Sequence, residues 1–384
     1  MTEVAHELTA GLWLICIALA IVGSAYLVFA ASLARKLKLR APPALQSPQG
    51  ITILKPLCGA EPGLETNLAS FCTQAYAGPV QIVFGVSEGS DPALAVVRQL
   101  VTKFPEADIE LVVGGSMPGA NRKISNLMPM ASRARHDLIV LSDSDIRVDQ
   151  TYLRQLVAAL AEPGVGLVTC LYRGTSDAGL PSRLAAMAIN HHFLPNVLVG
   201  LRLGLARPCF GSTIALKAAT LDRIGGLGAF ANQLADDYAI GKAVRDLGLG
   251  IAVAPLLVEH TCFHETWPEL VRREMRWART VRLIDPAGHA GSIITHPLPF
   301  ALAGAALDGF GATGLGIIAL ALGCRVLAPI QIGRLSGSRE VSLWLTPVRD
   351  LLSFVIFLAS LLPGPVAWRG RRYTVRSNGT LTPT

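Results

Sequence analysis

Two carboxylates, Asp143 and Asp145, stand one residue apart at the end of an apolar segment that reads VLSDSDIRV. Side chains alternate between faces along an extended strand, so both carboxylates are expected on one face, where they repel each other. A divalent cation removes that repulsion and can also hold a phosphorylated ligand. The spacing therefore predicts a metal and diphosphate site, with a water-exposed acidic strand end as the alternative.

A second acidic pair and a basic segment lie farther along the chain. Asp236 and Asp237 begin a segment with helical periodicity, where carboxylates also interact favourably with the helix dipole. The sequence RREMRWART places Arg273, Arg276 and Trp277 at positions i, i+3 and i+4, which share one face of a helix. That face offers guanidinium groups for a diphosphate and an indole ring for stacking. The alternative is a basic amphipathic helix lying on anionic lipid.

Asp91 and Lys123 each have a structural and a ligand-binding interpretation. Asp91 directly precedes Pro92 and suits the cap of the helix that follows. Lys123 stands at the start of another predicted helix, where its ammonium group either reaches a phosphate or faces solvent.

His264 and Glu265 begin the pattern of a zinc protease, but the HExxH motif needs a second histidine where this chain has Pro268. A protease of that class is therefore disfavoured. His260 and His264 are expected to be structural histidines, with a role as metal ligand from a neighbouring loop as the alternative.

Short apolar runs that alternate with helical stretches are expected to position these residues. Such alternation produces right-handed βαβ units and a parallel sheet, in which ligands bind at the carboxyl ends of the strands. Lys55, Asp91 and Asp143 lie at or after such ends, so we expect them to converge on one crevice. Strands are predicted at 51–57, 81–86, 109–114 and 137–143, and helices at 63–74, 92–104 and 123–133.

The common glycine-rich nucleotide motifs are absent. The turn after the first predicted strand reads KPLCGAEPG in place of GxGxxG, and no GxxxxGK[ST] occurs. A Rossmann dehydrogenase and a P-loop NTPase are both disfavoured. A nucleotide is therefore expected to be held by side chains and a metal ion.

The composition favours membrane attachment and an anionic partner. Hydrophobic residues make up 51% of the 384 residues, charged residues only 16%, and mean hydropathy is +0.45. The net charge of +7 suits lipid headgroups or a phosphorylated substrate, whereas the lack of a basic run interleaved with aromatic residues disfavours nucleic acid. Seven scattered cysteines without a CxxC pattern indicate reduced thiols in the cytosol.

The segment 11–33 carries no charge and is long enough to span a bilayer. Basic residues follow it at once, so the positive-inside rule places the N-terminus outside and the next domain in the cytoplasm. A cleaved signal peptide would have the opposite flanks. Apolar blocks at 297–333 and 341–362 predict two or three further spans. The patch 193–205 predicts an interfacial or re-entrant helix, with a buried core helix as the alternative.

These patterns predict six consecutive parts. They are a short non-cytoplasmic N-terminus (1–10), a transmembrane anchor (11–34), a basic, proline-containing linker (35–49), a cytoplasmic domain that carries the candidate site (50–285), a C-terminal transmembrane block (286–365) and a basic cytoplasmic tail (366–384).

Five motifs, KPLCGAEPGLETNL, SDPALAV, NRKISNLMPMASRARHDLIVLSDSDIRV, LADDYAIGKAV and RREMRWART, resemble in the same order those of the ceramide glucosyltransferase family. The resemblance covers roughly residues 50 to 285. It implies an inverting, UDP-sugar-dependent glycosyltransferase with the GT-A fold, an α/β fold with a Rossmann-like mixed sheet and flanking helices, joined here to transmembrane helices. A processive polysaccharide synthase is a more remote alternative, because synthases normally have more membrane spans.

Among bacterial members of that family, the chain is most similar to the hopanoid-biosynthesis glycosyltransferases. This resemblance implies a multi-pass protein of the bacterial inner membrane that transfers N-acetylglucosamine from its UDP-sugar to a hopanoid polyol such as bacteriohopanetetrol. Ceramide is the alternative acceptor, which would make the product a glucosylceramide-type lipid.

The resemblance also implies which residues bind the UDP-sugar. Asp91 matches the residue that contacts the uracil and ribose, and Asp143 and Asp145 match the pair that binds the diphosphate through Mg²⁺ or Mn²⁺. Asp143 is the stronger of the two assignments, because some eukaryotic members keep only the first acid. The remaining expected nucleotide-sugar-binding residues are Lys123, Arg273, Arg276 and Trp277.

Asp237 matches the general base of the family. An inverting enzyme needs a base that takes the proton of the acceptor hydroxyl while that oxygen attacks the anomeric carbon opposite the departing UDP. Asp236, one residue earlier, is the alternative base.

Overall fold

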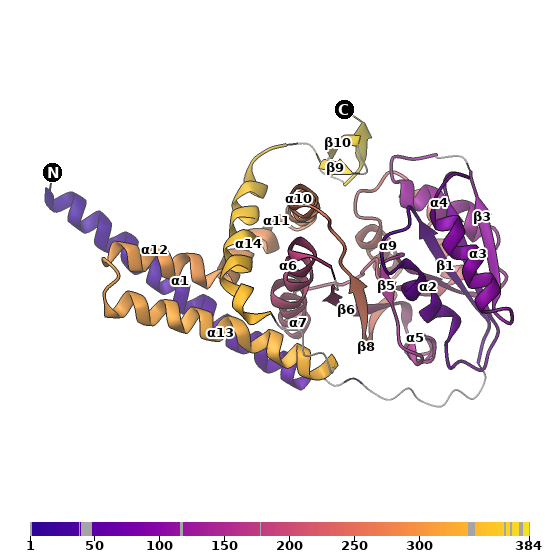
Figure 1. The fold of residues 1–384 in the computed structure, drawn as a ribbon, viewed down its shortest axis with the longest axis horizontal. Coiled ribbons are helices and arrows are strands. Elements are labelled where there is room, and N and C mark those ends of the chain that lie inside the picture. The colour runs from indigo at the N-terminus through magenta and orange to yellow at the C-terminus, as the bar shows by residue number, and fades with distance from the viewer. Residues whose placement is uncertain are drawn as a thin grey trace. The chain divides into compact units, whose positions relative to one another are not determined.

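The computed structural model describes residues 2–37, 39, 48–115, 118–176, 178–336, 342–364, 366–368, 371–375 and 379–383. The chain divides into two compact units (Figure 1). The sheet unit comprises Lys38–Ala178, Arg207–Phe263 and Pro365–Thr384, and the helical unit comprises Met1–Leu37, Gly179–Ala206 and His264–Gly364. The segment 50–285, predicted as one catalytic domain, thus contributes to both units.

An eight-stranded mixed sheet forms the centre of the sheet unit, in the order β3-β2-β1-β4-β7-β6-β8-β5. The four strands predicted before residue 145 all form and run parallel to one another. β7 pairs antiparallel with β4 and β6, and β5 pairs antiparallel with β8. The strands are β1 (Ile51–Leu57), β2 (Val80–Val86), β3 (Asp108–Val113), β4 (Leu138–Leu141), β5 (Ile146–Arg147), β6 (Val165–Thr175), β7 (Ile214–Lys217) and β8 (Gly250–Thr261).

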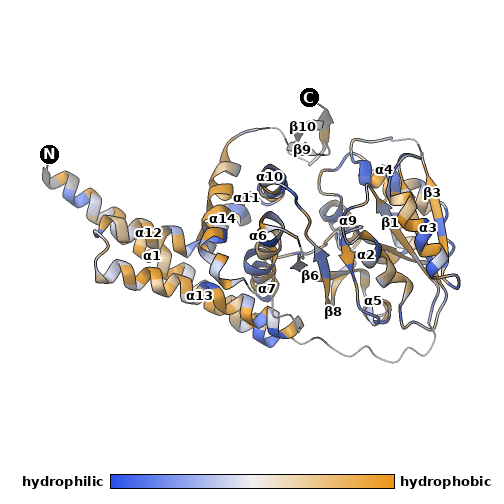
Figure 2. Cartoon of the chain, viewed as in Figure 1, coloured by the Kyte–Doolittle hydropathy of each residue, from blue (hydrophilic) through white to orange (hydrophobic). Residues whose placement is uncertain are grey.

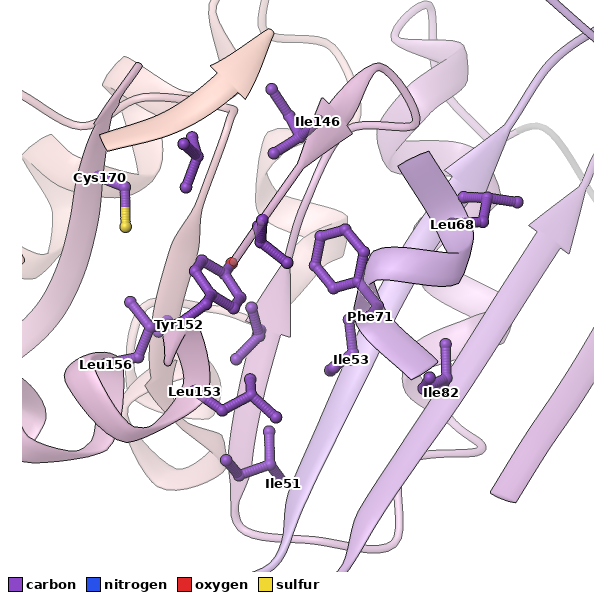
Figure 3. Packing of buried hydrophobic residues seen from close by; sticks show 14 of the residues in the cluster. Ile51, Ile53, Leu68, Phe71, Ile82, Ile146, Tyr152, Leu153, Leu156 and Cys170 are labelled. Atoms are coloured by element: carbon purple, nitrogen blue, oxygen red, sulfur yellow. The ribbon is translucent and has the colours of Figure 1, made fainter. Parts of the chain in front are cut away.

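Helices cover both faces of this sheet, so its central strands are apolar on both sides. In β1, Ile51 and Ile53 enter the core under α2, α3 and α5, whereas Leu54 enters the core under α4 and α9. Figure 3 shows the first of these cores, where the rings of Phe71 and Tyr152 meet edge to face with centroids 5.7 Å apart. The helices are α2 (Leu64–Cys72), α3 (Ala93–Lys103), α4 (Arg122–Ala131), α5 (Tyr152–Leu160), α8 (Ala218–Arg223), η2 (Leu227–Phe230) and α9 (Asp236–Asp246).

The C-terminal tail contributes a small antiparallel sheet to the sheet unit, in the order β11-β10-β9. A bridge between Thr380 and Gln233 joins it to the segment that precedes α9. The strands are β9 (Val366–Trp368), β10 (Arg371–Val375) and β11 (Leu381–Pro383).

The helical unit contains the long apolar helices (Figure 2). α1 packs along α12 and α13, and all three are hydrophobic over most of their length. Its elements are α1 (Thr2–Lys36), α6 (Leu180–Ala188), η1 (Ile189–Phe193), α7 (Leu194–Arg202), α10 (Trp267–Ile284), α11 (Pro286–Gly291), η3 (Ser292–Thr295), α12 (Pro297–Leu307), α13 (Ala312–Ser336), η4 (Leu343–Leu345) and α14 (Thr346–Leu361).

Four helices of the described ranges are long and apolar enough to cross a membrane: His6–Lys36, Leu180–Arg202, Ala312–Leu335 and Leu343–Leu361. A bent pair, Pro286–Thr295 with Pro297–Leu307, would be a fifth span if it crosses as one. By length and composition these are the helices of a membrane protein.

The sequence suggested a separate helix at 193–205, but the described part of the structure does not contain one. The described helical part of this patch, up to Arg202, is the second half of the helix that begins at Leu180 and continues through the π-helical turn η1. Within the helical unit, Tyr26 of α1 donates a hydrogen bond from its hydroxyl to Asn196 Oδ1 at 2.9 Å. The predicted patch began only at Phe193 because His191 and His192 interrupt the apolar run.

Buried ion pairs join the helices of this unit. Arg325 Nε lies 2.7 Å from Asp350 Oδ1, and both side chains are almost completely buried. Arg349 donates two hydrogen bonds to Glu274 of α10, from Nη1 at 2.5 Å and from Nη2 at 2.7 Å. Buried charges are stable only when paired, so the bidentate Arg349–Glu274 contact holds α10 against α14.

Candidate active site

The turn between β4 and β5 carries Asp143 and Asp145. β4 ends at Leu141, and Ile146 N donates a hydrogen bond to Asp143 O at 3.3 Å, so the backbone turns here and does not continue as the predicted strand. Alternation of faces applies only to extended backbone, and the two carboxylates consequently meet different partners. Asp143 Oδ1 lies 2.7 Å from Lys123 Nζ, and Asp145 Oδ1 lies 3.3 Å from His260 Nδ1.

Lys55 supports this turn from the neighbouring strand β1. Its side chain is fully buried, and Nζ donates to Asp143 O at 2.8 Å and to Ser142 Oγ at 3.3 Å. The ammonium group also lies 3.6 Å from the centre of the Phe71 ring. Burial lowers the pKa of Lys55 to about 7, although the nearby carboxylates oppose that shift. The predicted convergence of Lys55 and Asp143 is confirmed.

Lys123 connects the two acidic pairs. Its Nζ lies 2.7 Å from Asp143 Oδ1 and 3.2 Å from Asp236 Oδ2. Burial disfavours the charged lysine, but the carboxylates of Asp143 and Asp236 outweigh it and raise the pKa of Lys123. Burial raises the pKa of Asp143, and Lys123 offsets part of that rise. The ammonium group thus balances negative charge at both ends of the site.

Asp236 and Asp237 begin α9 and have different surroundings. Asp236 is buried, and its two oxygens are engaged by Lys123 and by Asn121 Nδ2 at 3.1 Å. Asp237 is partly exposed and accepts hydrogen bonds from Gly211 N at 3.0 Å and from Tyr238 N at 2.8 Å. Burial and the neighbouring Asp236 carboxylate raise the pKa of Asp237 to about 6. Such a carboxylate can take a proton near neutral pH.

Gly211 lies at the centre of this cluster, and sequence reasoning missed it. A Cβ atom at this position would lie 3.0 Å from Asp143 Oδ2, 3.1 Å from Lys123 Nζ and 3.6 Å from Asp237 Oδ2. A side chain here would therefore occupy the space between the metal-binding candidates and Asp237. The only sequence signal is a glycine before a strand, which is too common to single out.

Asp91 fastens two loops on the same side of the sheet. It accepts hydrogen bonds from Gly59 N at 3.0 and 3.1 Å and from Ala93 N, at the first residue of α3, at 2.9 Å. The carboxylate therefore stabilises the start of α3 and also holds the loop after β1. A shallow pocket beside this loop is lined by Cys58, Gly59, Glu61, Pro62, Leu64, Asn67, Ser144, Asp145 and Thr261.

Arg273, Arg276 and Trp277 lie on α10 and belong to the helical unit, whereas the other predicted site residues belong to the sheet unit. The predicted helix is confirmed, and the Arg273 guanidinium lies 4.9 Å from the centre of the Trp277 ring, as the i, i+4 spacing requires. Arg273 Nη1 is also 3.4 Å from His264 Nε2.

The donor set of the β4–β5 turn suits a hard divalent cation. No group of three or more histidine, cysteine or acidic side chains able to hold a metal occurs among the described residues. Mg²⁺ commonly binds through one or two carboxylates and takes its other ligands from water and substrate phosphates. Asp143 and Asp145 fit that pattern, with the His260 imidazole beside the second carboxylate.

Comparison with known proteins places these features among the glycosyltransferases. The model of glycosyl transferase family 21 matches residues 15–381. Ceramide glucosyltransferases 1 and 3 of Caenorhabditis elegans are 23% and 25% identical to this chain over 345 and 353 residues, which cover 86% and 87% of it and 73% and 74% of their own lengths.

A mannosyltransferase of Pyrobaculum calidifontis, solved with GDP-Man and Mn²⁺, has a similar structure. The TM-score is 0.56 at 20% identity, and the match covers 90% of this chain and 99% of that one. This likeness concerns the fold and confirms the predicted GT-A architecture.

Proposed function

Since the chain belongs to glycosyl transferase family 21 and is a membrane glycosyltransferase, we propose that it moves a sugar from a UDP-sugar to the hydroxyl group of a membrane lipid. The observation that carries this proposal is the cluster of Asp143, Lys123 and Asp237 around Gly211, at the carboxyl end of β4. Carboxylates for a metal, a lysine for a diphosphate and a base of raised pKa are the groups that sugar transfer from a nucleotide requires.

Asp237 is the base in this proposal. Asp236 is buried, and both its oxygens are held by Lys123 and Asn121, whereas Asp237 is partly exposed and its carboxylate is aligned by two backbone N–H groups. A base must approach the acceptor hydroxyl within hydrogen-bond distance, so the difference in exposure favours Asp237. Inversion follows when this carboxylate removes the hydroxyl proton on the side opposite the leaving UDP.

Asp143 and Asp145 hold the divalent cation, Mg²⁺ or Mn²⁺, in this proposal. That ion would neutralise charge on the departing diphosphate. The Mn²⁺ with which the Pyrobaculum mannosyltransferase was solved supports a cation of this kind. When a cation takes over Asp143, the Lys123 ammonium becomes available to a phosphate oxygen while it keeps Asp236 as a partner.

The family resemblance assigns four further residues to the UDP-sugar: Asp91 of the sheet unit and Arg273, Arg276 and Trp277 of the helical unit. Asp91 is proposed to contact the uridine. Its carboxylate lies beside the loop after β1, where it accepts a hydrogen bond from Gly59 N. The guanidinium groups of α10 are proposed to bind the diphosphate, and Trp277 to line the mouth that admits the acceptor. Within the helical unit, the contact of the Arg273 guanidinium with the Trp277 ring supports a shared helix face for these side chains.

Two acceptors remain in the proposal, and each rests on its own observation. The resemblance to the bacterial hopanoid-biosynthesis glycosyltransferases favours a hopanoid polyol such as bacteriohopanetetrol, with N-acetylglucosamine as the sugar. The names of the two worm relatives favour ceramide and glucose. Both acceptors are amphiphilic alcohols that the apolar helices can meet within the membrane.

Mass spectrometry of the lipid product tests this function. The purified protein in lipid nanodiscs is incubated with Mg²⁺ or Mn²⁺ and with UDP-N-acetylglucosamine or UDP-glucose, each with a hopanoid polyol or with ceramide. A single added hexose or N-acetylhexosamine on one lipid is expected. Asp237→Asn should abolish this product while the affinity for UDP, measured by calorimetry, stays unchanged. A multi-sugar polymer, or normal turnover by Asp237→Asn, would contradict the proposal.

A further inference from the structure

The segment just before the candidate base is bonded to the C-terminal strand. Leu381 N donates a hydrogen bond to Asn232 O at 2.8 Å, and Leu234 N donates one to Gly379 O at 3.0 Å. Between them, Gln233 pairs antiparallel with Thr380. Leu381 is only 3% exposed, so this contact is a packed one. All these residues belong to the sheet unit.

Asn121 holds the same segment from inside the fold. Its side chain is fully buried, and Nδ2 donates to Gln233 O at 2.9 Å and to Asp236 Oδ1 at 3.1 Å. Its Oδ1 accepts from Ile124 N at 3.1 Å and so caps α4. One amide group thus ties the start of α4 to the start of α9.

Backbone contacts and packing also position the segment: Ala120 N donates to Asn232 Oδ1 at 2.9 Å, Asn121 N donates to Ala231 O at 2.8 Å, and Leu234 is buried. Residues 231–235 lie outside the helices and the named strands, and Ala235, which precedes α9, offers no side chain to cap the helix. Asp237 is the second residue of α9, so its carboxylate moves with this segment. The side chain of Asn121 and the C-terminal strand therefore supply the hydrogen bonds that the entry into the helix receives on two sides, from α4 and from the tail.

We propose that Asn121 and the C-terminal residues Gly379 and Leu381 form a clamp that positions Asp237 for proton abstraction. The clamp rests on the proposed function, because it presumes that Asp237 is the base. These are positioning residues, since they act on Asp237 through residues 232–236. A displacement of about 1 Å at a reacting group can reduce the rate about 100-fold, so the clamp matters for turnover more than for donor binding.

A substitution at Gly379 can disturb the contact of the clamp with the C-terminal strand and leave the Asn121 side chain unchanged. The φ of Gly379, +81°, lies in the left-handed region, and a Cβ there would lie 3.0 Å from Gln233 Oε1, the end of a flexible side chain. Valine is strongly disfavoured in that conformation, whereas asparagine tolerates it. Gly379→Val should therefore displace the strand, and Gly379→Asn should preserve it.

Gly164 supplies a matched control in the same unit. Its φ is +78°, and nothing lies within 4 Å of the position that a Cβ would take, so Gly164→Val imposes a similar backbone strain away from the base. Asn121→Asp tests the inner side of the clamp. The aspartate keeps Oδ1, which accepts from Ile124 N and caps α4. Its second oxygen replaces the Nδ2 donor, so the hydrogen bonds to Gln233 O and Asp236 Oδ1 are lost.

The experiment measures kcat, KM for the UDP-sugar and calorimetric UDP affinity for each full-length variant in nanodiscs. Gly379→Val and Asn121→Asp should lower kcat by about 10- to 100-fold and leave KM and UDP affinity within about twofold of wild type. Gly379→Asn should restore most of the lost rate, and Gly164→Val should keep wild-type kcat.

Several outcomes would overturn the clamp. Unchanged kcat in both Gly379→Val and Asn121→Asp would do so, as would an equal loss of rate in Gly164→Val. If Gly379→Val does not fold, Asn121→Asp decides alone, because it keeps the cap of α4. Asp237→Asn separates the two proposals: its inactivity together with active clamp variants refutes only the clamp, whereas its full activity refutes the assigned base.

Discussion

At the scale of single residues, the site is a set of charges whose partners differ. Asp143, Asp236 and Asp237 bring three carboxylates to one place, and Lys123 is the cation that bridges two of them. The amide of Asn121 holds the other oxygen of Asp236, and the N–H groups of Gly211 and Tyr238 hold the two oxygens of Asp237. The three carboxylates therefore differ in their partners and exposure: Asp236 is buried, whereas Asp143 and Asp237 are partly exposed.

The rate should depend on pH through Asp237. Burial and Asp236 raise the pKa of Asp237 to about 6, so the carboxylate is protonated and inactive as a base below that pH. We expect kcat/KM to fall tenfold for each pH unit below about 6 and to level off above it. Turnover measured from about pH 4.5 to 8, with UDP affinity followed in parallel, checks this. A flat profile across this range would exclude a single base of this pKa.

Gly211→Ala should impair transfer although the change is only a methyl group. The new Cβ would lie 3.0 Å from Asp143 Oδ2 and 3.1 Å from Lys123 Nζ, so the charged side chains must move apart. Activity is expected to fall at least about tenfold, with metal-dependent UDP binding weakened as well. The control is Gly89→Ala, whose Cβ meets nothing closer than Val113 Cγ1 at 3.8 Å. Equal activity in the two variants would contradict a crowded site.

At the scale of elements, α10 is held by an ion pair and not by a hydrophobic face alone. Among the described side chains of α10, only Leu270 is buried. Arg349 of α14 donates hydrogen bonds to the Glu274 carboxylate from both terminal nitrogens. Ion pairs withdrawn from water are tolerated when geometry is good, and they fix orientation. The rotation of the helix that presents Arg276 and Trp277 is thereby set.

Glu274→Ala should destabilise the protein strongly. It leaves the Arg349 guanidinium buried at 1% exposure without its carboxylate, and loss of one partner of a buried pair costs about 3–5 kcal/mol. Thermal unfolding in detergent measures this, and adding Arg349→Met should recover part of the loss. Asp246→Asn removes the exposed pair with Lys242 and should change little, because solvent screens it. Similar melting temperatures for Glu274→Ala and Asp246→Asn would refute the argument.

The elements also show what the sequence can predict. Strand β1 was predicted at 51–57, the bounds it has, because a continuous apolar run between polar turns identifies a strand that is buried on both faces. The strand before Asp143 was predicted to end two residues too late, since the turn is held by Lys55 from another strand and leaves no local signal. Gly211 and Asn121 escaped notice for the same reason: their partners are distant in sequence.

At the scale of the whole molecule, the sequence predicted a membrane glycosyltransferase with a GT-A fold, and both are confirmed. The division into two units was not predicted. The chain leaves the sheet unit at Gly179 and again at His264, and returns at Arg207 and Pro365. The points at which the chain crosses between the two units depend on long-range packing, whereas hydropathy along the chain reports only local composition.

The orientation in the membrane stays a prediction that Cys58 can test. Arg35 and Lys36 end α1, so the positive-inside rule places the sheet unit in the cytoplasm of a bacterial cell. Cys58 is exposed in that unit, whereas Cys170, Cys209 and Cys262 are buried. A membrane-impermeant maleimide should label Cys58 in inside-out vesicles and spare it in intact spheroplasts. Cys58→Ser is the control, and labelling of spheroplasts would reverse the orientation.

The bridge made by Lys123 has a thermodynamic consequence. Because one ammonium group serves both Asp143 and the acidic start of α9, a change of charge at Asp143 acts through Lys123 on the ionisation of Asp237. Donor binding and proton release at the base are then linked, and linkage acts equally in both directions. The pKa of Asp237 should therefore differ between the free and the donor-bound protein, which predicts different apparent pKa values in the pH profiles of kcat/KM and of kcat.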